Sequence, residues 1–359
     1  MKIAVLKYYI ERREHESTLA TILSIILAIV AALLISALLI RMDGANVLDA
    51  YRSLFIGGFG SWRAIFETLN KATPLIFTGL ATVVAFRAQI WNIGGEGQFL
   101  AGAMAAYLAI TLFPKSPNSI LIIVILVFAL LAGGAIAGIS SFIKNRFNVD
   151  VIVSTVMMNY IIKFALSLML YSSWRDPSTF YPQSPFIPEN SYLPMLVEKY
   201  RFHAGFILAV LFAIITFLLV EKTPAGYELR ALGFNPIAAK SRGINPKRTL
   251  MWILLVSGSL AALGGAVELI GLTHRLRLDI SINYGFTGII VAMLADLNPL
   301  GVLVTGILFG GLTNGSFAMQ VKTGVPTSIA FAIQAIILLF VLSASILTRY
   351  TIRKVEDAH

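Results

Sequence analysis

The chain has 359 residues, of which 57% are hydrophobic and only 13% are charged. Soluble domains carry about a quarter charged residues, so this composition excludes a soluble globular protein and favours a bundle of membrane helices. The net charge of +10 does not indicate a nucleic-acid partner, because Lys and Arg lie in short segments between apolar runs, where they set the orientation in a membrane. The absence of cysteine excludes a disulfide framework and thiolate chemistry.

Ten apolar stretches approach or reach the length needed to cross a hydrocarbon core of about 30 Å. We expect spans at 19–40, 70–87, 92–113, 119–142, 150–171, 203–220, 250–272, 284–297, 299–315 and 326–347. The pair at 284–315 is short and is interrupted by ADLNPLG, so a broken or re-entrant pair fits equally well. The predicted fold class is an all-α polytopic transmembrane bundle of about ten spans, some short or broken.

Positive charge orients this threading. Lys and Arg are most concentrated in the segment 221–249, and this bias places both termini in the cytoplasm. We expect a cytoplasmic N-terminal segment at 1–18, a transmembrane domain at 19–348 and a cytoplasmic tail at 349–359. The external segment 172–202 contains five prolines, which block a continuous helix. It is either an ordered cap rich in aromatic residues or a plain connecting loop.

Polar side chains cluster at the start of one apolar run, in NIGGEGQFLAGA. Glu96 follows Asn92 by four residues and therefore shares its helical face, whereas Gln98 lies on another face. Ionisable groups are costly inside a membrane, so Glu96 is expected to face a cavity or a partner. Lining a cavity for a polar solute, locking the helix to its neighbour and relaying protons all fit. Asn159, in the middle of another span, fits either solute binding or a bridge between two helices.

Several catalytic signatures are absent from the sequence. It contains no G-x-x-x-x-G-K-[ST], no H-E-x-x-H and no G-x-S-x-G. The four histidines are scattered singly, so we expect no metal site. The chain is therefore not expected to be an enzyme or to bind a cofactor itself.

The basic, amphipathic segment PAGYELRALGFNPIAAKSRGINPKRT contains a short predicted helix. Asn235 is suited to cap it, Pro236 to occupy its first position and Gly243 to follow its end. A short helix on the cytoplasmic face is suited to docking a partner, although a solvated connector also fits.

Five motifs taken in order carry a family resemblance: NIGGEGQFLAGA, MMNYI, ELRALGFNPIAAKSRGI, SGSLAALGGAVELIG and YGFTGIIVAMLADLNPLGVLVTGILFGGL. Over roughly residues 70–345, the chain resembles the permease subunits of bacterial ABC importers. The branch is the one that handles simple sugars, branched-chain amino acids and nucleosides. NIGGEGQ together with MMNYI is most similar to the nucleoside permeases.

The resemblance implies a multi-pass permease of the bacterial cytoplasmic membrane that translocates nucleosides. A sugar or branched-chain amino acid permease remains an alternative, as does an ion-driven secondary transporter with Glu96 as its proton site. The implied partners are an ATP-binding subunit that binds ATP in place of this chain, an extracytoplasmic solute-binding protein, a second identical or related permease, and membrane lipid.

The resemblance also implies roles for particular residues. RALGFNPIAAKSRGI would be the coupling helix that contacts the ATP-binding subunit. Its matching positions are Gly233, Asn235, Ala238, Ala239 and Gly243. Ile237-Ala238-Ala239 stands where more distant importers have Glu-Ala-Ala. From the polar residues themselves, and not from the resemblance, we expect Asn92, Glu96 and Gln98 to form or brace a substrate path, with Asn159 as a further candidate.

Overall fold

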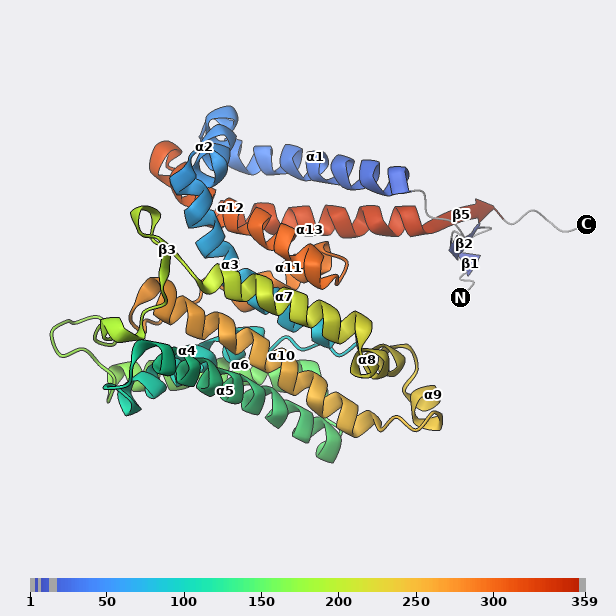
Figure 1. The fold of residues 1–359 in the computed structure, drawn as a ribbon. Helices are drawn as coiled ribbons and strands as arrows, with labels where there is room; N and C mark the ends of the chain where they lie inside the picture. The colour runs from blue at the N-terminus through green and yellow to red at the C-terminus, as the bar shows by residue number, and fades with distance from the viewer. Residues whose placement is uncertain (1–3, 6–7, 13–17, 355–359) are drawn as a thin grey trace, which may run out of the picture. The chain divides into compact units, whose positions relative to one another are not determined.

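The structure is a computed structural model that describes residues 4–5, 8–12 and 18–354. Its described residues form thirteen α-helices and five short strands (Figure 1), which confirms the all-α class. The chain divides into two compact units. One comprises Met1–Leu54 with Ser316–His359, and the other comprises Phe55–Gly315.

The unit Phe55–Gly315 holds most of the helices. They are α3 (Trp62–Phe86), α4 (Gly95–Leu112), α5 (Asn118–Phe147), α6 (Val151–Tyr171), α7 (Gly205–Lys222), α8 (Pro224–Phe234), α9 (Pro236–Ser241), α10 (Pro246–Glu268), α11 (Tyr284–Leu294) and most of α12 (Pro299–Thr323). A π-helical turn, Leu269–Thr273, extends α10. Strands β3 (Met195–Val197) and β4 (Phe202–His203) form an antiparallel hairpin, and Figure 1 places it at the opposite end of the helices from α8 and α9.

The other unit contains α1 (Thr18–Met42), the start of α2 (Val47–Phe59), the end of α12 and α13 (Thr327–Arg349). Strands β1 (Ala4–Val5), β2 (Tyr8–Arg12) and β5 (Tyr350–Lys354) form an antiparallel sheet in the order β1-β2-β5. This sheet joins the segments 1–18 and 349–359, for which the sequence predicted no strand. Residues 1–3, 6–7, 13–17 and 355–359 of those two segments lie outside the described residues.

Among the described residues, six helices are long and apolar enough to cross a membrane. They are α3, α5, α6, α7, α10 with its π-helical turn, and α12, and the pair α1–α2, bent by 114°, would add a seventh. The predicted spans at 92–113 and 326–347 coincide with α4 and α13. The predicted span at 284–297 contains α11, whose 11 residues reach only about 16 Å. The pair at 284–315 is broken, as the sequence allowed, but its second member is α12 with 25 residues, whereas the sequence indicated two short helices.

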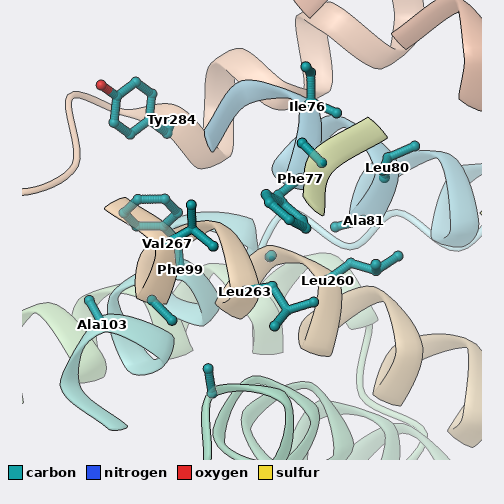
Figure 2. Packing of buried hydrophobic residues seen from close by; sticks show 14 of the residues in the cluster. Ile76, Phe77, Leu80, Ala81, Phe99, Ala103, Leu260, Leu263, Val267 and Tyr284 are labelled. Carbon is teal, nitrogen blue, oxygen red and sulfur yellow. The ribbon is translucent and has the colours of Figure 1, made fainter. Parts of the chain in front are cut away.

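Small residues let α10 approach α4 closely. A Cβ on Gly102 would overlap the Ala262 backbone, and one on Gly265 would overlap the Phe99 carbonyl. Such positions allow backbone contact in lipid, where helix association depends on close packing. Figure 2 shows the surrounding apolar side chains, which include Phe77, Phe99, Leu260, Leu263, Val267 and Tyr284.

The segment 172–202 is an ordered cap. Its backbone N–H groups donate to carbonyl oxygens at and after the end of α10, in the pairs Ser184–Leu276, Ile187–His274 and Leu193–Ile270. The Asn70 side chain, on α3, donates to the Arg201 carbonyl at 2.9 Å. Five prolines thus do not leave the segment unstructured, because neighbouring elements satisfy its backbone.

Candidate translocation path and coupling surface

Two buried amides stand at the start of α4. Asn92 Nδ2 donates to Gln98 Oε1 at 3.2 Å, and Gln98 Nε2 donates to Asn92 Oδ1 at 3.1 Å. Asn92 Nδ2 also donates to Ser257 Oγ on α10 at 2.9 Å, and that hydroxyl donates to the Ala81 carbonyl on α3 at 2.7 Å. The pair thereby ties α4 to α10 and α3.

Asn159, on α6, fastens the same helix start from another side. Its Oδ1 accepts from the Gly97 N–H at 2.8 Å, and its Nδ2 donates to the Ile93 carbonyl at 2.9 Å. The Ile93 N–H donates to Thr155 Oγ1, one turn earlier on α6, at 3.3 Å. Gly97 is required here, because a Cβ would lie 2.8 Å from the Asn159 Cα. We call Asn92, Gln98, Asn159, Ser257 and Thr155 the amide cluster.

Glu96 has a different environment from the amides. Its Oε2 accepts from the Gly285 N–H at 2.8 Å, and its carboxylate faces the Ser281 hydroxyl. Gly285 is the second residue of α11, so the carboxylate lies where the N-termini of α4 and α11 meet. Helix N-termini carry unpaired N–H groups and favour negative charge. The exposed Lys163 adds a distant positive charge.

The structure thus brings all four path residues to one helix start. The three amides connect the start of α4 to α6 and α10, and Glu96 connects it to α11. Sequence reasoning missed Ser257 and Thr155. Hydroxyl side chains in apolar runs gave no signal by themselves, because such residues often bond to their own helix.

The predicted coupling segment forms α8 and α9. Asn235 caps α9, since its Oδ1 accepts from the Ile237 and Ala238 N–H groups at 3.0 and 3.1 Å. Pro236 occupies the first helical position, where no N–H is needed. Gly243 follows the helix with φ +86°, a left-handed conformation that favours glycine.

The five predicted coupling residues divide by exposure. Gly233 and Ala239 are buried, and a Cβ on Gly233 would lie 2.9 Å from the Arg87 carbonyl oxygen. Asn235, Ala238 and Gly243 are exposed.

Two large apolar side chains lie beside these exposed residues. Phe234 is 85% exposed and Ile237 is 79% exposed. Sequence reasoning did not single them out, although each is an apolar residue in a basic segment. We call the exposed residues Phe234, Asn235, Ile237, Ala238 and Gly243 the coupling surface.

Metal binding has no support in the part of the chain that the structure describes. No group of three or more His, Asp or Glu side chains gathers there within reach of one ion.

Comparison with known proteins decides the family. The model of the family described as "Branched-chain amino acid transport system / permease component" matches residues 64–342. The chain belongs to this family. It is a multi-pass membrane transport subunit of the ABC permease type and not an enzyme. The family works with an ATP-binding subunit and a solute-binding protein.

Three relatives show how far the likeness extends. The guanosine ABC transporter permease protein NupP of Bacillus subtilis is 35% identical over 89% of this chain and 92% of its own. The nucleoside ABC transporter permease protein NupB of Lactococcus lactis is 31% identical over 88% and 89%. The glucose ABC transporter permease protein TsgB13 of Haloferax volcanii is 28% identical over 91% and 88%.

Proposed function

We propose that this permease translocates nucleosides. The observation that carries the proposal is 35% identity, over 89% of the chain, to a permease named for guanosine. The 31% identity to a permease named for nucleosides supports the same substrate class. The relative named for glucose is less similar, at 28%, and makes a sugar the competing substrate.

Glu96 is the path residue that we propose contacts the solute. Nucleosides present ribose hydroxyls and ring N–H donors, which need acceptors that an apolar path does not provide. The Glu96 carboxylate is an acceptor with more than one lone pair, and one oxygen accepts from Gly285. The amide cluster braces this carboxylate, because it fixes the helix start from which Glu96 projects.

The coupling surface is the part that we propose docks the ATP-binding subunit. Phe234 and Ile237 are large apolar side chains exposed three residues apart in the sequence, a pattern typical of interface anchors. Docking there places α8 and α9 in the cytoplasm, in agreement with the basic segment 221–249. From the same charge bias along the sequence, we propose that both chain termini are cytoplasmic. A second permease, identical or related, completes the transporter, and the solute-binding protein delivers the nucleoside at the opposite end.

Uptake with competitors tests the substrate. Labelled guanosine and adenosine are supplied to cells with and without this gene, with unlabelled ribose, glucose or leucine as competitors. The proposal predicts gene-dependent uptake that only nucleosides inhibit. Inhibition by glucose or ribose would reassign the substrate to a sugar, and inhibition by leucine would reassign it to an amino acid.

Substitution tests the role of Glu96. Glu96→Leu should reduce nucleoside uptake by at least about tenfold, the effect of losing one strong polar contact, while the ATP-binding subunit still copurifies. The matched control is Glu67→Leu, which removes a carboxylate that is 42% exposed on α3. Uptake at the parental rate in Glu96→Leu would show that the solute does not use this carboxylate.

A further inference from the structure

Arg87 makes two different contacts at the end of α3. Its Nε donates to the Leu297 carbonyl at 3.0 Å, and its guanidinium NH1 lies 2.6 Å from Glu221 Oε1. The two side chains of this ion pair are 22% and 28% exposed. A guanidinium has five N–H donors in a planar fork, so it can hold both partners at once.

The Glu221 contact leads to the coupling segment. Glu221 lies in the last turn of α7, two residues before the Thr223 cap of α8. Its other oxygen lies 3.6 Å from Arg230 on α8, and Arg230 also donates to the Val220 carbonyl. The carboxylate therefore joins α3 to the helix that carries Phe234 at its end.

The Leu297 contact leads to α11. Asp296 and Leu297 both have left-handed backbones, with φ +50° and +56°, and they separate α11 from α12. The Leu297 N–H closes α11 by donating to the Ala292 carbonyl at 2.9 Å. The Leu297 carbonyl then points outside the helix and accepts from Arg87.

Helix α11 is held at its other end by the proposed path. Gly285 donates to Glu96, and Thr78 on α3 donates to the Tyr284 carbonyl at 3.0 Å. Gly288 lies so close to Thr78 that a Cβ would overlap its side chain. Eleven residues make α11 a short rigid rod with Glu96 at one end and Arg87 near the other.

We propose that Arg87 is a positioning residue that links the α7–α8 junction to α11, so that movement of the coupling segment repositions the Glu96 end of the path. This link rests on the proposed function of the coupling surface. In this proposal, Arg87 acts through its contacts with Glu221 and Leu297. The two side chains of the ion pair are only 22% and 28% exposed, so its removal also costs stability. The test therefore compares uptake with ATP hydrolysis in transporters that have assembled.

The test measures uptake and ATP hydrolysis in the same proteoliposomes. The vesicles contain the complete transporter, that is, this chain with its second permease and ATP-binding subunits, and labelled guanosine with the solute-binding protein is supplied outside. Arg87→Gln should lower guanosine uptake per ATP hydrolysed by about tenfold, within the range of ordinary coupling between two sites. Arg63→Gln is the matched control, because it removes a guanidinium that is 76% exposed in the first turn of α3, at the opposite end of that helix from Arg87, and should leave the ratio at the parental value.

Two milder variants separate positioning from simple folding. In Arg87→Lys, a single ammonium keeps the charge but cannot reproduce the fork, so the ratio should recover only in part. Glu221→Gln should lower the ratio while the Arg87 contact with Leu297 remains. If Arg87→Gln fails to assemble, the ratio of uptake to ATP hydrolysis in these two variants tests the proposal in its place.

An unchanged ratio in Arg87→Gln would overturn the link. So would a parental ratio in both Arg87→Lys and Glu221→Gln, or a parallel fall of uptake and hydrolysis in all three variants. Failure of the proposed function would look different, because Phe234→Asp would then keep its ATP-binding subunit whatever the Arg87 variants do.

Discussion

The amide cluster and the coupling surface differ in the kind of side chain that each buries or exposes. At the start of α4, polar side chains are buried, and Asn92, Gln98 and Asn159 find partners within the chain. On α8 and α9, the apolar side chains of Phe234 and Ile237 are 85% and 79% exposed.

The difference indicates where each region does its work. An unpaired buried polar group costs about 1–3 kcal/mol. An amide that hydrogen-bonds to buried polar groups of the protein therefore stabilises the fold. An exposed apolar side chain contributes little to the fold, and a group of them marks an interaction surface. We therefore interpret the amide cluster as a brace and the coupling surface as an interface, with Glu96 as the polar group through which the brace serves transport.

Phe234→Asp should have the largest effect on either region. A charge at the centre of an apolar interface removes an anchor that is typically worth about 3 kcal/mol, which is roughly a hundredfold in affinity. Copurification with the ATP-binding subunit and a titration of its binding measure the loss. Tyr227→Asp, at an exposed position near the start of the same helix α8, is the control. Equal losses of binding in the two variants would show that Phe234 is not an anchor of the interface.

His203 is also a buried polar side chain, but unlike the amides it has a ring nitrogen without a hydrogen-bond partner. Its Nδ1 accepts from the Gly205 N–H at 3.1 Å, whereas its Nε2 has no partner. Burial, aided by the nearby His274, lowers the pKa of His203 from 6.5 to about 4. Because the pKa of His203 is lower in the folded than in the unfolded protein, its contribution to the free energy of unfolding is fully present above pH 6.5. This contribution is lost as the pH falls towards 4.

The expected loss between those pH values is about 3 kcal/mol. Thermal unfolding of the purified transporter across this range measures it, and His203→Gln should remove most of it. His274 should leave a smaller dependence, because burial and the charge of Arg201 lower its pKa as well. A parental pH profile in His203→Gln would assign the dependence to other groups.

Asn92→Leu tests the brace itself. The substitution leaves Gln98 and Ser257 without their partner, so we expect a loss of about 2 kcal/mol in the free energy of unfolding. The double variant with Gln98→Leu should cost less than the sum of the two single variants, because each removes the partner of the other. Strictly additive losses would show that the two amides do not stabilise each other.

Gly243→Ala should have the smallest effect. The left-handed φ of +86° disfavours alanine by about 1 kcal/mol, although a Cβ there would meet nothing within 4 Å. The unfolding temperature should fall slightly, and the ATP-binding subunit should remain bound. Loss of binding in Gly243→Ala would make this glycine a contact residue, and not only the end of α9.

Local patterns in the sequence predicted much of this architecture. Asn235, Pro236 and Gly243 predicted α9 because capping and left-handed turns depend on neighbouring residues only. The long apolar runs predicted the spanning helices, and ADLNPLG predicted the break before α12. The sequence did not predict the strands β1, β2 and β5, because β2 pairs with a strand at the other end of the chain and local patterns do not report such a pairing.

The candidate site was harder to predict for the same physical reason. The motif NIGGEGQ identified the polar helix start, but not which groups would pair with each other. Ser257 and Gly285 lie more than 150 residues away in sequence from Asn92 and Glu96, which they contact. Arg87 and Glu221 are each unremarkable at the end of an apolar run, and only the fold brings them together.

The most direct test of the account is guanosine uptake into proteoliposomes that contain the complete transporter, with ATP or a non-hydrolysable analogue supplied to the ATP-binding subunits. We predict uptake that requires ATP hydrolysis, resists an uncoupler and disappears in Phe234→Asp. Uptake without ATP that collapses with the proton gradient would contradict the account and would make Glu96 the proton site of a secondary transporter.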